Sequence, residues 1–219
     1  MIKLSKAGKM PCKSWSLQAL DTCPGSIKQD GELVDACKGC YATTGNYNFP
    51  NVKAPRVHNR EDWKRTDWVQ EMIKELKKQT HFRWFDSGDV YDHRLAKKML
   101  KVMEETPWCK HWLPTRMHKF PKINIVLKEM DKLPNAAVRL SSDSINGELI
   151  QSKMPTSTIV PTAEDATSSM TVCKAYERDG KCADCRACWD KSVKTIAYVA
   201  HGRKINKVYK DKIKIMEIV

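Results

Sequence analysis

The chain has 219 residues, 41% of them hydrophobic, so it is long enough to bury a core without crosslinks. Its 39 Lys and Arg residues exceed its 26 Asp and Glu residues by 13, which favours an anionic ligand, nucleic acid or an acidic protein as partner. No apolar run is long enough to cross a membrane, and the first residues lack the apolar core of a signal peptide. We therefore expect no membrane association, a cytoplasmic location, and cysteines that bind metal rather than form disulfides.

We expect a single domain over 1–219, made of three consecutive segments. A cysteine loop occupies 1–57, strand and helix units occupy 58–172, and 173–219 holds a second cysteine loop, a last strand and a basic tail. The lysines of that tail alternate with apolar residues, a pattern typical of a solvated basic face or of a nucleic-acid surface.

Hydrophobic periodicity in the middle of the chain predicts alternating helices and strands. Helices are expected over 58–79, from about 92 until Pro107, and from 121 until Pro134, and strands at 82–85, 111–113, 136–140, 158–160 and 195–200. From Trp84 to Trp112 is 28 positions and from Trp112 to Arg139 is 27, which suits one strand and one helix per repeat. The sequence therefore predicts an α/β fold whose parallel strands form a partial (β/α) barrel.

Polar residues follow each predicted strand, at the carboxyl edge where α/β folds place their chemistry. The candidate residues for binding a cofactor or an anionic ligand are Asp86, Ser87, Gly88, Asp89, Arg116, Ser142 and Asp143. Turns and helix caps require the same residue types at the same positions, so each of these side chains is equally suited to a structural role.

The more specific cysteine motif lies late in the chain. Cys182, Cys185 and Cys188 have the C-x2-C-x2-C spacing with which ferredoxins hold three irons of a [4Fe-4S] cluster, and Cys173 lies nine positions upstream. We expect these four thiolates to bind one cluster. Zinc is the alternative, although structural zinc usually takes two separate C-x2-C pairs.

A looser set near the start comprises Cys12, Cys23, Cys37 and Cys40, of which the last two form a C-x2-C pair. We expect it to bind a second [4Fe-4S] cluster, again with zinc as the alternative. A third arrangement would join members of both sets in one site and leave other cysteines without partners. Cys109 stands alone and is expected to be a small buried apolar side chain.

Short motifs at 3–5, 10–16, 37–42, 85–89 and 182–189 carry a resemblance that covers nearly the whole chain. Together they resemble an uncharacterised phage-encoded family, the gene-product-eighty-eight domain. The resemblance implies a phage protein that acts in a bacterial cytoplasm, and it brings little established biochemistry.

At the level of the fold, the chain is also similar to radical S-adenosylmethionine enzymes, which carry a cysteine loop on a βα barrel. The similarity implies that Ser87, Gly88 and Asp89 take the place of the strand end that binds the methionine moiety. Those enzymes use a C-x3-C-x2-C motif whose three thiolates leave one iron open. Four thiolates in the first set would leave no open iron for S-adenosylmethionine.

The leading hypothesis is an iron-sulfur protein with two [4Fe-4S] clusters, which exchanges electrons with an unidentified donor or acceptor or performs a redox step on an anionic ligand. One alternative is a radical S-adenosylmethionine enzyme in which Cys23, Cys37 and Cys40 hold a cluster with one open iron. Another is a zinc-stabilised module that binds nucleic acid or protein. The sequence has no recognisable nucleophile and base pair, Walker loop or Rossmann fingerprint, so it does not decide whether the protein is an enzyme.

Overall fold

An open sheet of eight strands forms the centre of the molecule. The computed structural model describes residues 1–6, 8 and 10–218, with side chains as far as residue 212. Within this part of the chain the strand order is β1-β2-β3-β4-β5-β6-β8-β7, with β1 antiparallel to β2 and all other neighbours parallel. The strands are β1 (Ser5–Lys6), β2 (Lys13–Trp15), β3 (His81–Trp84), β4 (Lys110–Thr115), β5 (Ala136–Ser141), β6 (Thr156–Val160), β7 (Thr171–Cys173) and β8 (Thr195–Val199).

The predicted α/β class is confirmed. The five expected strands are present as β3, β4, β5, β6 and β8, each within two residues of its predicted ends. The edges of the sheet, β1 and β7, do not pair with each other among the described residues, so the sheet is open. The partial barrel, which is a finer description of the same sheet, stays a prediction.

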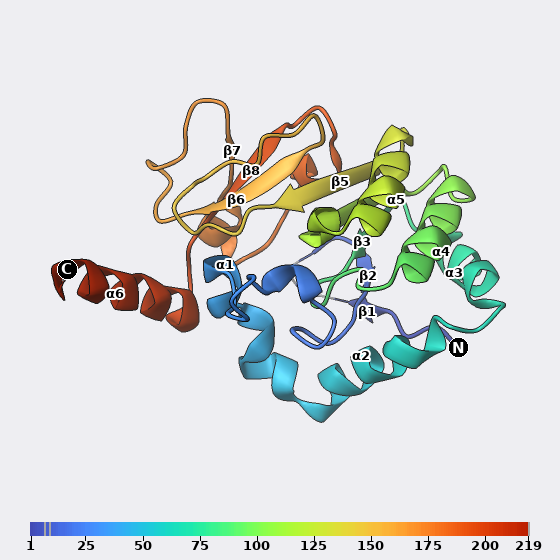
Figure 1. Ribbon diagram of the computed structural model, residues 1–219. Helices are drawn as coiled ribbons and strands as arrows, with labels where there is room; N and C mark the ends of the chain where they lie inside the picture. The colour runs from blue at the N-terminus through green and yellow to red at the C-terminus, as the bar shows by residue number, and fades with distance from the viewer. Residues whose placement is uncertain (7, 9, 219) are drawn as a thin grey trace.

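Three amphipathic helices build the main core on one side of the sheet (Figure 1). The helices of the chain are α1 (Asp35–Lys38), α2 (Pro50–Asp62), α3 (Trp68–Leu76), α4 (His93–Glu104), α5 (Pro121–Lys132) and α6 (Arg203–Ile218). Successive strand residues point to opposite faces, so Phe82, Trp84, Leu113 and Val138 all meet the apolar stripes of α3, α4 and α5. This core fixes which strand residues face the helices and which face the other way.

The expected helix over 58–79 is instead two helices, α2 and α3, with a break between Asp62 and Trp68. The carbonyl groups of Trp63 and Arg65 do not continue a helix, because both accept hydrogen bonds from the ammonium group of Lys98 on α4. The break turns the chain so that the indoles of both Trp63 and Trp68 are buried.

The opposite face of the sheet carries the alternate strand residues, whose side chains point away from α3, α4 and α5. Ser14, Arg83 and Trp112 lie side by side on neighbouring strands, and Arg139 follows on β5. The segment between β7 and β8 covers this face, since the indole N–H of Trp189 donates to the carbonyl of Phe82 at 2.9 Å. Helices α3, α4 and α5 therefore cover one face of the central strands, and the segment between β7 and β8 covers the other.

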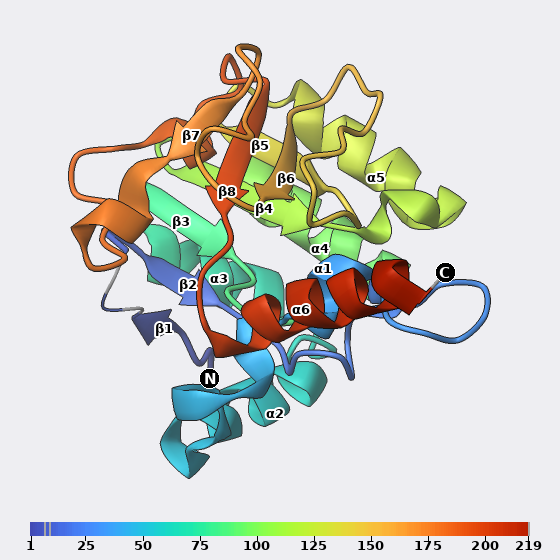
Figure 2. The same cartoon turned by 90° about the vertical axis from the view of Figure 1, so that its left-hand side faces the viewer.

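The final helix, α6, extends away from the body of the molecule (Figures 1 and 2). Its first half packs through Ile205, Val208 and Tyr209 on Ala36 of α1 and on Ile145. The predicted tail residues beyond 212 have side chains outside the described part of the chain. None of the described helices is both long and apolar enough to cross a membrane.

His111 on β4 is part of the core and not of the strand surface. Its ring accepts a hydrogen bond from the Trp84 indole at 3.2 Å, and its other nitrogen lies 2.8 Å from the Thr106 hydroxyl. Burial lowers the pKa of His111 to about 3, although the hydrogen bond with Thr106 opposes that shift. The imidazole is therefore neutral at physiological pH.

We predict that this histidine makes the fold sensitive to acid. The unfolded chain takes up a proton on His111 below about pH 6.5 and the folded chain does not until about pH 3, so stability falls across that window by about 1.4 kcal/mol per pH unit. Replacing His111 with Gln should reduce the slope of the unfolding free energy between about pH 7 and pH 5, measured by urea unfolding. An unchanged slope in His111→Gln would contradict the prediction.

Candidate functional site

The eight predicted metal ligands form two sets, but Cys12 does not lie in the expected one. Strand β2 runs between Cys12, which directly precedes it, and Cys23, which lies beyond its carboxyl end. Extended chain rises about 3.3 Å per residue, so the stretch from 12 to 17 alone separates the ends by roughly 16 Å. Cys23, Cys37 and Cys40 remain together and are called the amino-terminal site. The carboxyl-terminal site consists of Cys12, Cys173, Cys182, Cys185 and Cys188.

Short backbone hydrogen bonds hold the three cysteines of the amino-terminal site. The carbonyl of Cys23 accepts from the Ser26 N–H at 2.9 Å, and Val34 N–H then donates to the Ser26 carbonyl at 2.8 Å, which links the Cys23 loop to α1. Cys37 lies in α1 and Cys40 follows it, with the Cys40 N–H donating to the Cys37 carbonyl at 3.1 Å. Two short turns thus bring the three thiols to one end of the sheet.

The three thiols are close enough to influence one another. Burial raises the pKa of Cys23, and the Asp89 carboxylate and the thiols of Cys37 and Cys40 raise it further. Burial also raises the pKa of Cys37, while the Arg116 guanidinium opposes that shift. A cation bound among them would therefore displace protons from buried thiols.

The predicted cofactor-binding residues gather at the same edge of the sheet, but most of their polar atoms already have protein partners. Asp86 forms a buried ion pair with Arg56 of α2, at 2.9 and 3.1 Å from the two carboxylate oxygens. The Ser87 hydroxyl donates to the Leu17 carbonyl at 2.7 Å and accepts from Arg56 at 2.6 Å. These two residues therefore fasten α2 to the ends of β2 and β3.

Gly88 and Asp89 likewise have structural roles at this edge of the sheet. Gly88 has φ +78°, and a Cβ there would meet Leu17 and Thr22 at 2.6 and 2.7 Å, so only glycine fits. The Asp89 carboxylate accepts from the Thr115 hydroxyl at 2.7 Å and from the backbone N–H of Arg116 at 2.9 Å. Burial raises the pKa of Asp89, and these hydrogen bonds oppose the shift. Asp89 thus joins β3 to the end of β4.

Arg116 and Asp143 form a loose ion pair with each other, and the second carboxylate oxygen of Asp143 accepts from the ammonium group of Lys119 at 2.5 Å. Arg116 donates to the Ser142 carbonyl at 2.8 Å, but its Nε lies 3.5 Å from Asp143 Oδ1 without forming a hydrogen bond. Neither atom has a hydrogen-bond partner among the described residues, although both are buried. The Ser142 hydroxyl caps a turn by accepting from the Ser144 N–H at 3.2 Å. Of the predicted set, Arg116 and Asp143 are the best placed to contact a ligand beside Cys37.

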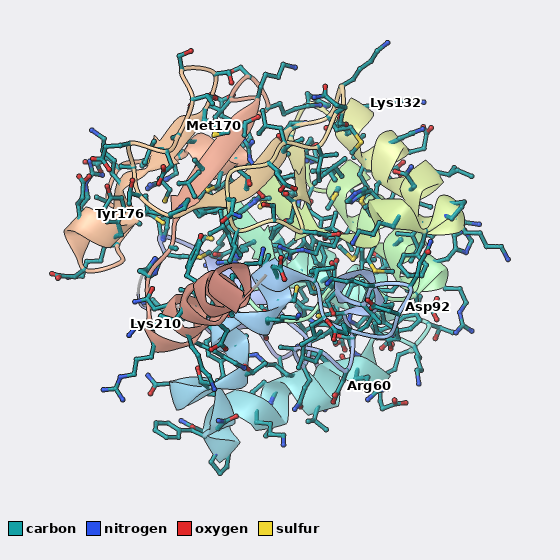
Figure 3. The ribbon with its side chains drawn as sticks, turned by 60° about the vertical axis from the view of Figure 1, so that its left-hand side comes forward. Arg60, Asp92, Lys132, Met170, Tyr176 and Lys210 are labelled. Atoms are coloured by element: carbon teal, nitrogen blue, oxygen red, sulfur yellow. The ribbon has the colours of Figure 1, made fainter. Side chains whose placement is uncertain are left out.

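The carboxyl-terminal site is organised by one buried arginine. The guanidinium of Arg139, on β5, donates to four carbonyl groups of the loop between β7 and β8, those of Ala187, Cys188, Asp190 and Val193, at 2.5 to 3.0 Å. Arg139 is fully buried, and no carboxylate lies within 4 Å of it among the described residues. The loop that carries Cys182, Cys185 and Cys188 is thus anchored to the sheet; Tyr176, labelled in Figure 3, lies at its start.

Cys12 packs into this second site. It forms a small cluster with Trp112 and Trp189, against which Cys188 and Tyr198 also pack. Burial raises the pKa of Cys12 to about 12, Arg83 opposes the shift, and the nearby Cys182 thiol adds to it. The Tyr198 hydroxyl lies 3.4 Å from the sulfur of Cys188. The signal that sequence reasoning missed was the short strand β2, which separates Cys12 from Cys23.

Cationic and N–H groups surround the cysteines of the carboxyl-terminal site. Burial raises the pKa of Cys182 and raises that of Cys188 to about 11, whereas Arg83 and Arg186 oppose the shift of Cys182, and Arg139 and Arg83 oppose that of Cys188. The Trp112 indole N–H is buried and has no hydrogen-bond acceptor among the described residues. Positive charge and a spare donor are what an anionic, sulfur-rich group requires of its surroundings. The residues present therefore fit such a group.

Backbone strain is concentrated at these loops. Among the described residues, the non-glycine positions with left-handed φ are Leu20, Phe85, Asp179 and Ala183. Leu20 precedes Cys23, Phe85 lies between the end of β3 and Asp86, and Ala183 lies between Cys182 and Cys185. Each such residue costs about 1 to 2 kcal/mol, a strain that typically persists where a site requires a particular loop shape.

No group of three or more histidine, cysteine, aspartate or glutamate side chains in the described part of the chain surrounds a common point as a single metal ion requires. Thiolates around one zinc ion, with Zn–S bonds of about 2.3 Å, stand much closer together than thiolates around a four-iron cluster, where irons and sulfides lie between them. The two sites are accordingly defined here by the proximity of their thiols.

Fold and side chains together define an open, mostly parallel α/β protein with two separate cysteine sites. Residues 2–191 match the model of the family described as gene product 88, and because this is most of the chain, the protein belongs to that family. The matched region ends before β8 and α6. Comparisons with curated proteins and with solved structures gave no match.

We predict that Arg56→Met destabilises the protein by about 3 to 5 kcal/mol, because it leaves the buried Asp86 carboxylate without its cation. The matched control is Arg94→Met, which removes the arginine of the more exposed Arg94 and Asp92 pair and should cost less than about 1 kcal/mol. Urea unfolding of the two variants measures both values. Equal costs would show that the buried pair has no special role.

Proposed function

We propose that this protein is a phage iron-sulfur protein that holds a [4Fe-4S] cluster at each cysteine site. The observation that carries the proposal is the carboxyl-terminal site, where the buried thiol of Cys12 and the partly buried thiol of Cys188 lie near arginines that have no carboxylate partner in the described structure. Such clusters transfer single electrons when bound. The protein's own residues supply thiolate ligands, positive charge and exclusion of water by Trp112 and Trp189.

The environment of the carboxyl-terminal site supports a cluster in particular. A [4Fe-4S] core with its thiolates carries net negative charge, and burying it requires compensation. Arg139 and Arg83 provide cations on the sheet itself, and Arg186 provides one on the loop. The C-x2-C-x2-C spacing of Cys182, Cys185 and Cys188 supports the same conclusion. We assign electron exchange with a donor or acceptor to this site, since Cys185 is exposed.

The amino-terminal site favours a different role. With Cys12 at the other site, Cys23, Cys37 and Cys40 supply three thiolates, so one position of a cluster would be open to a small ligand. Arg116 and Asp143, with their unpartnered buried atoms, lie beside Cys37 and suit a ligand that carries both charges. We therefore propose that the redox step on a bound ligand belongs to this site.

The second candidate function, a radical S-adenosylmethionine enzyme on a partial barrel, is supported by the same three-thiolate set. The amino and carboxylate groups of that molecule have the charges that Asp143 and Arg116 would bind. Adding S-adenosylmethionine to the reduced protein should perturb the paramagnetic spectrum of the cluster that remains in the triple variant Cys182→Ser/Cys185→Ser/Cys188→Ser. An unchanged spectrum and no 5'-deoxyadenosine would exclude this candidate and leave the two-cluster proposal intact.

We predict that protein purified without oxygen contains about eight irons and eight sulfides per chain, with a broad visible absorption shoulder. Cys37→Ser and the triple variant Cys182→Ser/Cys185→Ser/Cys188→Ser should each lose about half of the iron, because each leaves two thiols at its own site and the sites use separate cysteines. Cys12→Ser should alter only the cluster that persists in Cys37→Ser. Cys109→Ser, which changes a buried thiol outside both sites, is the control and should retain all the iron.

Colourless protein with about two zinc ions per chain would overturn the proposal and favour the zinc-stabilised binding module, for which the net charge of +13 suits nucleic acid or an acidic protein. Equal loss of iron from both sites in Cys37→Ser would contradict the division into two independent sites.

A further inference from the structure

Arg83 stands between the two cysteine sites. It projects from β3 onto the face opposite α3, α4 and α5, where its guanidinium lies 4.4 Å from the centre of the Trp112 ring. On one side it donates to the sulfur of Met10 at 3.0 Å, two residues before Cys12. On the other side it donates to the Tyr41 hydroxyl at 3.3 Å, one residue after Cys40. One side chain therefore reaches the loops of both sites.

Each of the three nitrogens of this guanidinium donates a hydrogen bond to a neighbouring group. Its Nε donates to the Phe85 carbonyl at 3.2 Å, and Tyr41 passes the contact on by donating to the Asp86 carbonyl at 2.7 Å. All of its hydrogen-bond acceptors are neutral, and the Asp86 carboxylate, which acts on it electrostatically, is already paired with Arg56. A cation held by a sulfur, a phenol, a carbonyl and an aromatic ring keeps most of its charge available to its surroundings.

That charge acts on the carboxyl-terminal site. The guanidinium stacks on the Trp112 ring, which packs in one cluster with Cys12 and Trp189 and against Cys188. Its hydrogen bond to Met10 holds it beside the segment that leads to Cys12. One side chain thus places its positive charge next to cysteines from two distant segments of the chain.

We propose that Arg83 is the positioning residue that sets the reduction potential of the carboxyl-terminal cluster and couples it electrostatically to the amino-terminal site through Tyr41. This inference rests on the proposed function, since it requires a cluster at the carboxyl-terminal site. A fixed cation stabilises the reduced, more negative form of a cluster, so it raises the reduction potential. Raising that potential makes the carboxyl-terminal cluster the better acceptor of an incoming electron.

The test measures the reduction potential of the carboxyl-terminal cluster in full-length protein that carries Cys37→Ser, so that only this cluster titrates. Adding Arg83→Gln should shift the potential to more negative values, because the cation is lost while a polar side chain remains. Arg83→Lys should restore a potential close to that of the parent, because it retains the charge. Lys128→Gln, which removes one exposed charge from α5, controls for the change in net charge and should leave the potential unchanged.

A potential in Arg83→Gln equal to that of the parent, with iron and sulfide retained, would overturn the inference and leave the proposed function standing. Parent protein without iron would instead overturn the proposed function, so the two failures are distinguishable. If Arg83→Gln does not fold, Arg83→Lys decides: a potential near that of the parent supports the role of charge, and a clearly lower one overturns it.

The coupling has its own readout. In the Cys182→Ser/Cys185→Ser/Cys188→Ser background, where only the amino-terminal cluster titrates, Arg83→Gln and Tyr41→Phe should both shift its potential. These shifts should be smaller than the one that Arg83→Gln causes in the carboxyl-terminal cluster. Tyr47→Phe is the matched control, because its hydroxyl lies 3.5 Å from Asp86 and makes no hydrogen bond with Arg83. A shift in Tyr47→Phe equal to that in Tyr41→Phe would remove Tyr41 from the link.

Discussion

The position of the carboxyl-terminal cysteines depends on one buried arginine. Arg139 occupies the middle of the sheet, where a side chain normally packs against other apolar groups, and instead donates to four backbone carbonyls of the covering loop. Burying an unpaired guanidinium is costly, and only a full set of acceptors makes it tolerable. The loop therefore has one place to lie, and its cysteines, together with Trp189, come to rest on Arg83, Trp112 and Cys12.

The polar residues at the carboxyl edge of the sheet differ in how far their hydrogen-bonding groups are already used within the protein. Asp86, Ser87 and Asp89 form hydrogen bonds with α2, with the segment that follows β2 and with the end of β4. Arg116 and Asp143, in contrast, each have an atom without a hydrogen-bond partner near the thiols in the described structure. The same residue types thus serve structure in one turn and remain available for chemistry in the next. The strained φ of Phe85 belongs to this arrangement, because it turns the chain toward Arg56.

Most of the fold followed from the sequence because the strands and helices of the middle segment have strong, regular hydrophobic periods. The assignment of Cys12 did not, because β2 is only three residues long, Lys13–Trp15, and too short to give a periodic signal. When that strand is not recognised, the sequence predicts that Cys12 and Cys23 lie in one loop. The ion pair between Asp86 and Arg56 was not predicted either, because the two residues lie 30 positions apart and only the packing of α2 brings them together.

The insertion of β8 between β6 and β7 determines the order in which the molecule can be assembled. The carboxyl-terminal cysteines lie before β8 in the chain, yet β7, which leads into their loop, pairs only with β8 in the described sheet. During synthesis the cysteine loop leaves the ribosome just ahead of β8, so β7 and the edge of β6 stay unpaired until β8 follows. β7 and the start of the cysteine loop can therefore join the sheet only after β8 has paired with β6.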